Sequence, residues 1–219
     1  MHPDSYKFYR TAYTLAVFTI VYNILEGIVS IYFGVSDESL SLFGFGADSF
    51  IEAVSGLGIA HMVLRIQKNP VGQRDRFEKT ALRVTGFAFY ALVAGLCASI
   101  IVNLLTAHRP DTTLAGVIIS VVSIGVMLAL IRAKTRVGRS LNSPAIIADA
   151  HCTTVCVYMS VVLLIASAAY ELTGTAYVDD LGAAALAFFS FREGRECFRQ
   201  SRNDDHCGCG DEATDSETR

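Results

Sequence analysis

Charged side chains are scarce in this chain: Asp, Glu, Lys and Arg make up 18% of its 219 residues, and tryptophan is absent. Soluble domains usually carry about a quarter charged residues, so the deficit excludes an ordinary water-facing surface. Hydrophobic residues make up 52% of the chain, and the mean hydropathy is +0.42. This composition is typical of a membrane protein.

Other missing features exclude further classes of protein. Apolar runs occupy most of the length, so no segment is left that could bury the core of a separate catalytic domain. The net charge of -3 offers no basic surface for nucleic acid, and the six cysteines are too scattered for the disulfide framework of a small secreted protein. We therefore predict a membrane protein that is not an enzyme.

Six apolar segments approach the length of about 20 residues that a helix needs to cross a bilayer core. They cover residues 12–34, 39–64, 84–107, 113–131, 145–170 and 177–191. The last is the weakest, and five spans plus a surface helix is the alternative. The first is too long and too polar for a cleaved signal peptide, so we expect it to remain. The predicted fold class is an all-α membrane protein with six transmembrane helices.

Basic residues are distributed very unevenly between the two sides of such a six-span chain. One side receives seventeen of the eighteen. These are Lys7, Arg10, Arg65, Lys68, Arg74, Arg76, Lys79, Arg83, Arg132, Lys134, Arg136, Arg139, Arg192, Arg195, Arg199, Arg202 and Arg219. The other side receives only Arg109. The positive-inside rule then predicts that both termini are cytoplasmic, and five spans would spoil this asymmetry.

The second span carries a polar stripe. Asp48 and Glu52 are four residues apart, and with Ser55 they fall within an arc of about 60° on a helical wheel. An ionisable group inside a span costs at least a few kcal/mol and is a functional candidate by default. Two neighbouring carboxylates would repel if both were ionised, so they either share a proton or bind a cation.

The fifth span carries a matching set of polar residues. Asp149, Cys152 and Cys156 share one face, whereas His151 points to the opposite side. A single cysteine in an apolar helix is commonly just a small hydrophobic residue, but two at this spacing beside Asp149 favour metal ligation. Counted along the helices, both pairs lie near the midplane of a core about 30 Å thick. We therefore expect the two pairs to meet.

These paired spacings resemble those of the cation diffusion facilitator family of metal transporters. The stretch Ala-Asp-Ser-Phe-Ile-Glu at residues 47–52 is similar to the family's second-helix ligand pair. In the fifth helix Ala148-Asp149 sets the family's register, which puts Cys152 at the usual His position and Cys156 at the usual Asp position. The resemblance covers residues 10–198.

The resemblance implies six spans, cytoplasmic termini and a four-ligand metal site of Asp48, Glu52, Cys152 and Cys156. It is closest to compact bacterial members, so we expect a bacterial plasma membrane and no C-terminal cytoplasmic domain. The expected parts are a cytoplasmic segment (1–11), a transport domain (12–198) and a disordered cytoplasmic tail (199–219). In the tail, His206, Cys207 and Cys209 could capture metal, although an ordinary solvated tail is the alternative.

Two carboxylates and two thiolates suit tetrahedral Zn²⁺, with Cd²⁺ and Cu⁺ as alternatives. Metal and protons compete for the same atoms, so the expected activity is metal efflux coupled to proton antiport. The metal is cargo, and no permanent cofactor is expected. Four further residues are candidates for proton coupling or the ion pathway: Asn23, Glu26, Ser55 and Asp149.

Other interpretations of the same residues remain open. One is a membrane thiol oxidoreductase using Cys152 and Cys156, although side chains stacked along one helix have poor disulfide geometry. Another is a metal sensor that does not transport. Small residues at Ala91, Gly95 and Ser99 suit close helix packing, either within the bundle or across a homodimer.

Overall fold

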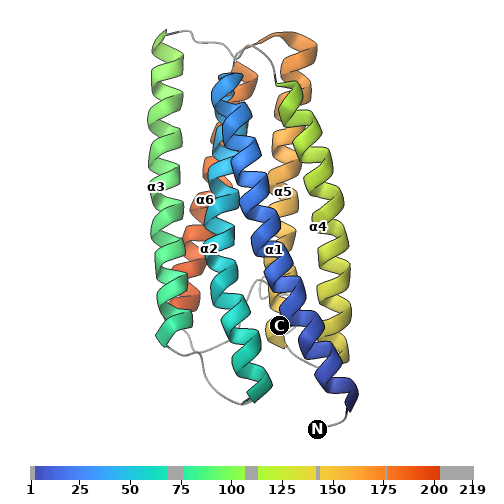
Figure 1. The fold of residues 1–219 in the computed structure, drawn as a ribbon. Coiled ribbons are helices and arrows are strands. Elements are labelled where there is room, and N and C mark those ends of the chain that lie inside the picture. Colours follow the sequence, from blue (N-terminus) through green and yellow to red (C-terminus); the bar gives the residue numbers. More distant parts are fainter. Residues whose placement is uncertain (1–2, 69–75, 107–112, 142–143, 176, 203–219) are drawn as a thin grey trace, which may run out of the picture.

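The structure is a computed structural model that describes residues 3–68, 76–106, 113–141, 144–175 and 177–202. Six long helices account for nearly all of them, and these described ranges contain no strand. The helices are α1 (Pro3–Ser36), α2 (Leu40–Lys68), α3 (Arg76–Thr106), α4 (Leu114–Ser140), α5 (Pro144–Thr173) and α6 (Tyr177–Arg202). They run alongside one another in an elongated bundle, with the start of α1 and the end of α6 at the same end (Figure 1). We call this the inner end.

The predicted all-α membrane fold is confirmed. Among the described residues, α1 to α5 each contain a segment long and apolar enough to cross a membrane. Helix α6, the weakest predicted span, does not meet that criterion of composition. It nevertheless lies inside the bundle against α2, α3 and α5, where Leu186 is fully buried. A helix with a buried face between three others is part of the bundle rather than a separate surface helix.

The helices extend further at the inner end than the apolar runs predict. Helix α1 begins at Pro3, α4 continues to Ser140 and α6 continues to Arg202. Lys and Arg are good helix formers, and continuing the helix keeps the backbone hydrogen-bonded. Basic residues expected in loops therefore lie on helical extensions instead.

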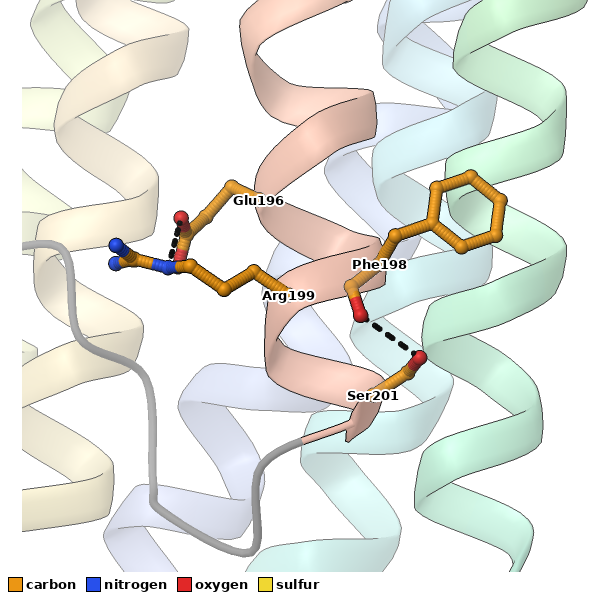
Figure 2. Close-up of polar contacts among 4 residues, drawn as sticks. All are labelled: Glu196, Phe198, Arg199 and Ser201. Atoms are coloured by element: carbon orange, nitrogen blue, oxygen red, sulfur yellow. Dashed lines mark hydrogen bonds and ion pairs between the residues drawn. The ribbon is translucent and has the colours of Figure 1, made fainter.

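The inner part of α6 illustrates such an extension. Figure 2 shows Glu196 paired with Arg199, whose nitrogen lies 2.9 Å from the carboxylate, and the Ser201 hydroxyl donating to the Phe198 carbonyl at 3.0 Å. The Phe198 side chain points toward α3, where its ring stacks on Tyr90 with centroids 5.5 Å apart. The polar contacts lie within α6 itself, and the aromatic packing holds this helix against α3.

The apolar core lies between α2, α3, α5 and α6, where Leu42, Leu96, Leu163 and Leu186 are almost completely buried. Helices α1 and α2 approach each other more closely, because glycine faces the neighbouring backbone. A Cβ at Gly34 would lie only 2.6 Å from the Phe43 backbone nitrogen. This tight packing brings the polar residues of α1 next to those of α2.

Carboxylates from other helices cap two helix starts at the outer end. Asp179 of α6 accepts hydrogen bonds from the Ser39 hydroxyl at 2.8 Å and from the Leu40 backbone N–H at 2.7 Å. Glu171 of α5 accepts one from the Thr113 backbone N–H, just before α4. The first turn of a helix has unpaired N–H donors, so these carboxylates stabilise the helix starts and join them to α6 and α5.

Candidate metal transport site

The centre of the site is a direct contact between α2 and α5. The Cys156 thiol of α5 donates to Oε1 of Glu52 of α2, with sulfur and oxygen 2.5 Å apart. The two residues are 104 positions apart in the chain, so the contact depends on how the two helices pack. The structure thus brings together one predicted ligand from each helix.

Asp48 lies one turn from Glu52 on α2 and is only 2% exposed. Among the described residues, none hydrogen-bonds to its buried Oδ1 atom. Burying an unpartnered carboxylate oxygen is costly, so this atom needs a proton or a cation.

Asn23 of α1 holds the other side of Glu52. Its Nδ2 donates to Glu52 Oε2 at 3.2 Å, and the residue is 1% exposed. The amide oxygen Oδ1 of Asn23 is also buried and finds no hydrogen-bond donor among the described residues. Glu52 is therefore fixed between α1 and α5, with a second unpartnered oxygen beside it.

Glu26, one turn further along α1, is surrounded by hydroxyl groups. It accepts hydrogen bonds from Tyr22 at 2.9 Å and from Ser49 of α2 at 3.1 Å, and Ser123 of α4 also bonds to it. The hydroxyl oxygens of Ser123 and Ser160 are 2.9 Å apart, which links this cluster to α5. Polar groups from α1, α2, α4 and α5 thus meet inside an otherwise apolar bundle.

Several predicted site residues fall outside what the structure describes. These are the side chains of Ser55, Asp149 and Cys152, together with His206, Cys207 and Cys209 of the tail. Among the side chains that are described, no group of three or more His, Cys, Asp or Glu residues is placed to hold a metal ion. The four-ligand site therefore remains a prediction, of which Glu52 and Cys156 are seen in contact.

The structure adds one residue that the sequence reasoning misplaced. Lys134, counted among the basic residues of a cytoplasmic loop, lies within α4 and is only 2% exposed. Its Nζ donates to Thr153 Oγ1 of α5 at 2.9 Å. Gly116, Ser120, Ser123, Met127, Leu130 and Lys134 are all buried on α4. Their spacing of three or four residues is the signal that could have placed Lys134 on the inward face.

Comparison with known families agrees with this architecture. No curated protein matches the chain. The transmembrane domain of the cation efflux family matches residues 16–204, which include all of α2 to α6 and most of α1. The members of that family are transporters rather than enzymes, and a match over most of the chain shows membership. The chain is therefore an integral, multi-pass membrane protein that belongs to the cation efflux, or cation diffusion facilitator, family of transmembrane cation transporters.

Proposed function

We propose that this protein exports divalent transition-metal ions, with Zn²⁺ as the favoured cargo, in exchange for protons. The proposed site consists of Asp48, Glu52, Cys152 and Cys156. The observation that carries the proposal is the hydrogen bond from the Cys156 thiol to Glu52.

That hydrogen bond puts a proton between two proposed metal ligands. A metal ion can bind Cys156 only as thiolate, so its entry must release this proton. The unpartnered oxygen of Asp48 supplies a further acceptor one turn away. Because metal and proton occupy the same atoms in turn, a proton gradient can drive metal release on the opposite side.

The ligand set bears on which ions are carried. Sulfur ligands suit Zn²⁺, Cd²⁺ and Cu⁺, whereas Mg²⁺ and Ca²⁺ prefer shells made only of oxygen. Glu26, held by Tyr22 and Ser49, is the proposed proton acceptor beside the site. Its hydroxyl neighbours can pass a proton toward α5 through Ser123 and Ser160.

Orientation and assembly are part of the same proposal. The excess of basic residues at the inner end supports cytoplasmic termini in a bacterial plasma membrane. On α3, Ala91 and Gly95 are exposed, and a Cβ at Gly95 would meet nothing within 4 Å. This small-residue surface faces away from the bundle, which supports a homodimer through α3.

The direct test is Zn²⁺ uptake into proteoliposomes that contain a zinc-sensitive dye. We expect uptake to be fast when the lumen is acidic and slow without a pH gradient. The Zn²⁺ flux of the Asp48→Asn and Cys156→Ala variants should fall by at least about tenfold, which is the usual effect of removing a metal ligand or a group that supports one. Cys97→Ala is the matched control, because Cys97 is an exposed cysteine on α3. The proposal would be contradicted if the Zn²⁺ flux did not depend on the pH gradient, or if the two site variants transported Zn²⁺ at the wild-type rate.

A binding test separates site formation from transport. Alkylation of Cys156 in the detergent-solubilised protein should be slowed by Zn²⁺ or Cd²⁺ and not by Mg²⁺. The reaction is read at the Cys156 peptide by mass spectrometry, so that the other cysteines do not contribute. Equal alkylation with and without Zn²⁺ would count against ligation by this thiol.

A further inference from the structure

A buried lysine lies beside the proposed site, on a helix that contributes none of its ligands. Lys134 of α4 is 2% exposed, and its ammonium donates to Thr153 Oγ1 of α5 at 2.9 Å. By contrast, Arg132 and Arg136 on the same helix are exposed. Burying an ammonium group costs several kcal/mol even after the surroundings relax, so a purely space-filling role would be served better by an apolar residue.

The position of Thr153 locates this charge relative to the ligands. Thr153 precedes Cys156 by three residues, about 4.5 Å along α5 toward the inner end. Helix α4 ends at Ser140, so Lys134 also lies on that side. The ammonium is therefore held inward of Cys156, at the level where Cys152 also lies in the sequence of α5.

The charge of Lys134 acts on the ligands from this position. Thr153 and Cys156 are three residues apart on one face of α5, so the ammonium stands close to Cys156 and to the Glu52 carboxyl that Cys156 contacts. Two unit charges several ångströms apart inside a protein interact by a few kcal/mol, and a divalent ion doubles the effect. A fixed positive charge that attracts the ligands must also repel a metal ion bound to them.

We propose that Lys134 is a tethered cation that competes with the transported metal ion for the negative charge of Glu52 and Cys156, and so lowers the metal affinity of the site. The inference rests on the proposed function, because it assumes that these two residues bind the cargo. A transporter must release what it binds, and a positive charge beside the ligands weakens binding without blocking the site. Lys134 does not coordinate the metal but sets the electrostatic cost of its entry.

The variant Lys134→Gln removes the charge and keeps a group that can donate to Thr153 Oγ1. The probe is Zn²⁺, and the readout is the concentration that half-protects Cys156 from a small thiol reagent in the solubilised full chain. Each variant is normalised to its own metal-free alkylation rate, and the measurement is made at alkaline pH, where protons compete least. We expect Lys134→Gln to lower the half-protecting concentration by about tenfold or more.

Two controls separate charge from structure. Lys134→Arg keeps the positive charge and should stay close to the wild type. Arg136→Gln removes one positive charge from an exposed site two residues away and should also leave the half-protecting concentration unchanged. If gel filtration shows that Lys134→Gln disturbs folding, two further variants separate loss of the charge from loss of the hydrogen bond. Lys134→Met removes the charge and should tighten Zn²⁺ binding, whereas Thr153→Val removes only the hydrogen-bond acceptor and should not.

The outcomes separate this inference from the proposed function. If Zn²⁺ does not protect Cys156 in the wild type, both are overturned. If the wild type is protected and Lys134→Gln requires the same or a higher Zn²⁺ concentration, only the role of Lys134 is overturned. Tighter binding in Lys134→Gln and Lys134→Met, with both charge controls unchanged, supports it.

Discussion

Glu52 receives hydrogen bonds on both of its carboxylate oxygens, from two different helices. Cys156 donates to Oε1 and Asn23 Nδ2 donates to Oε2. A ligand held in this way loses little conformational entropy when an ion binds, and groups that orient a ligand commonly contribute about 10- to 100-fold in metal affinity. At the scale of single residues, Asn23 therefore orients the carboxylate of Glu52, one of the four proposed metal ligands.

This role predicts the effect of removing the amide. Asn23→Ala should raise the Zn²⁺ concentration that half-protects Cys156 by about tenfold, because Glu52 loses the hydrogen bond that orients its Oε2 atom. Thermal unfolding of the same sample checks that the bundle is intact. Ser30→Ala is a matched control, since Ser30 is also fully buried on α1 and its hydroxyl finds no partner among the described residues. Unchanged protection in Asn23→Ala would show that Glu52 is positioned without it.

For a substitution of Glu26 we expect a different result, because Glu26 lies among hydroxyl groups rather than beside a proposed thiol ligand. Glu26→Gln keeps the size and can still hydrogen-bond with Tyr22 and Ser49, but it cannot take up a proton at its side chain. We expect pH-driven Zn²⁺ flux to fall by about tenfold or more, with Zn²⁺ protection of Cys156 retained. Loss of both flux and protection would mean that Glu26 supports the binding site itself.

The residue scale also shows what the sequence could and could not reveal. Asn23, Glu26, Asp48 and Glu52 could be identified because each is polar within an apolar run. Lys134 is missed because it follows the apolar run of its span and is counted as a loop residue. Its spacing of four residues from Leu130 is compatible with the buried face of α4, but that spacing counts only because the helix extends to Ser140 and packs against α5.

At the scale of helices, the carboxylate of Asp179 joins α6 to α2 at the outer end of the bundle. This one side chain accepts from Ser39, Leu40 and Ser41, so it both caps the start of α2 and binds α2 to α6. In the sequence, Asp179 stands at the start of the sixth predicted span, with no local sign of a partner. The capping partner is some 140 residues away, and such a pairing follows from tertiary packing rather than from any local pattern.

The capping role predicts a loss of stability at the outer end. Asp179→Asn replaces the carboxylate that accepts from backbone and hydroxyl donors with a neutral amide. We expect it to lower the free energy of unfolding by about 2–4 kcal/mol. A lowered thermal unfolding midpoint in detergent is the measurement. Asp180→Asn is the control, because among the described residues the Asp180 side chain accepts a single hydrogen bond, from Asn103 at 3.3 Å. Equal destabilisation by the two variants would argue against the cap.

At the scale of the whole molecule, the six helices form one bundle in which α6 is buried despite its polar inner part. Helix α6 packs along α3, and the Phe198 ring also meets Phe87 edge-on with centroids 5.0 Å apart. Apolar length alone identified five spans with ease and left the sixth ambiguous. The distribution of charge favours six, because basic residues collect at one end only when α6 crosses as well.

The membrane topology can be tested with fusions at each terminus. An even number of crossings requires both termini on one side, and the excess of basic residues predicts that this side is the cytoplasm. A fluorescent protein that folds only in the cytoplasm should be bright at either terminus, and a phosphatase active only outside should be silent at both. Fusions truncated after Thr173 should reverse the C-terminal result, because α6 is then missing while α1 to α5 remain. A full-length C-terminal fusion with an active phosphatase would instead mean that α6 does not cross, and that its buried face is covered without spanning the bilayer.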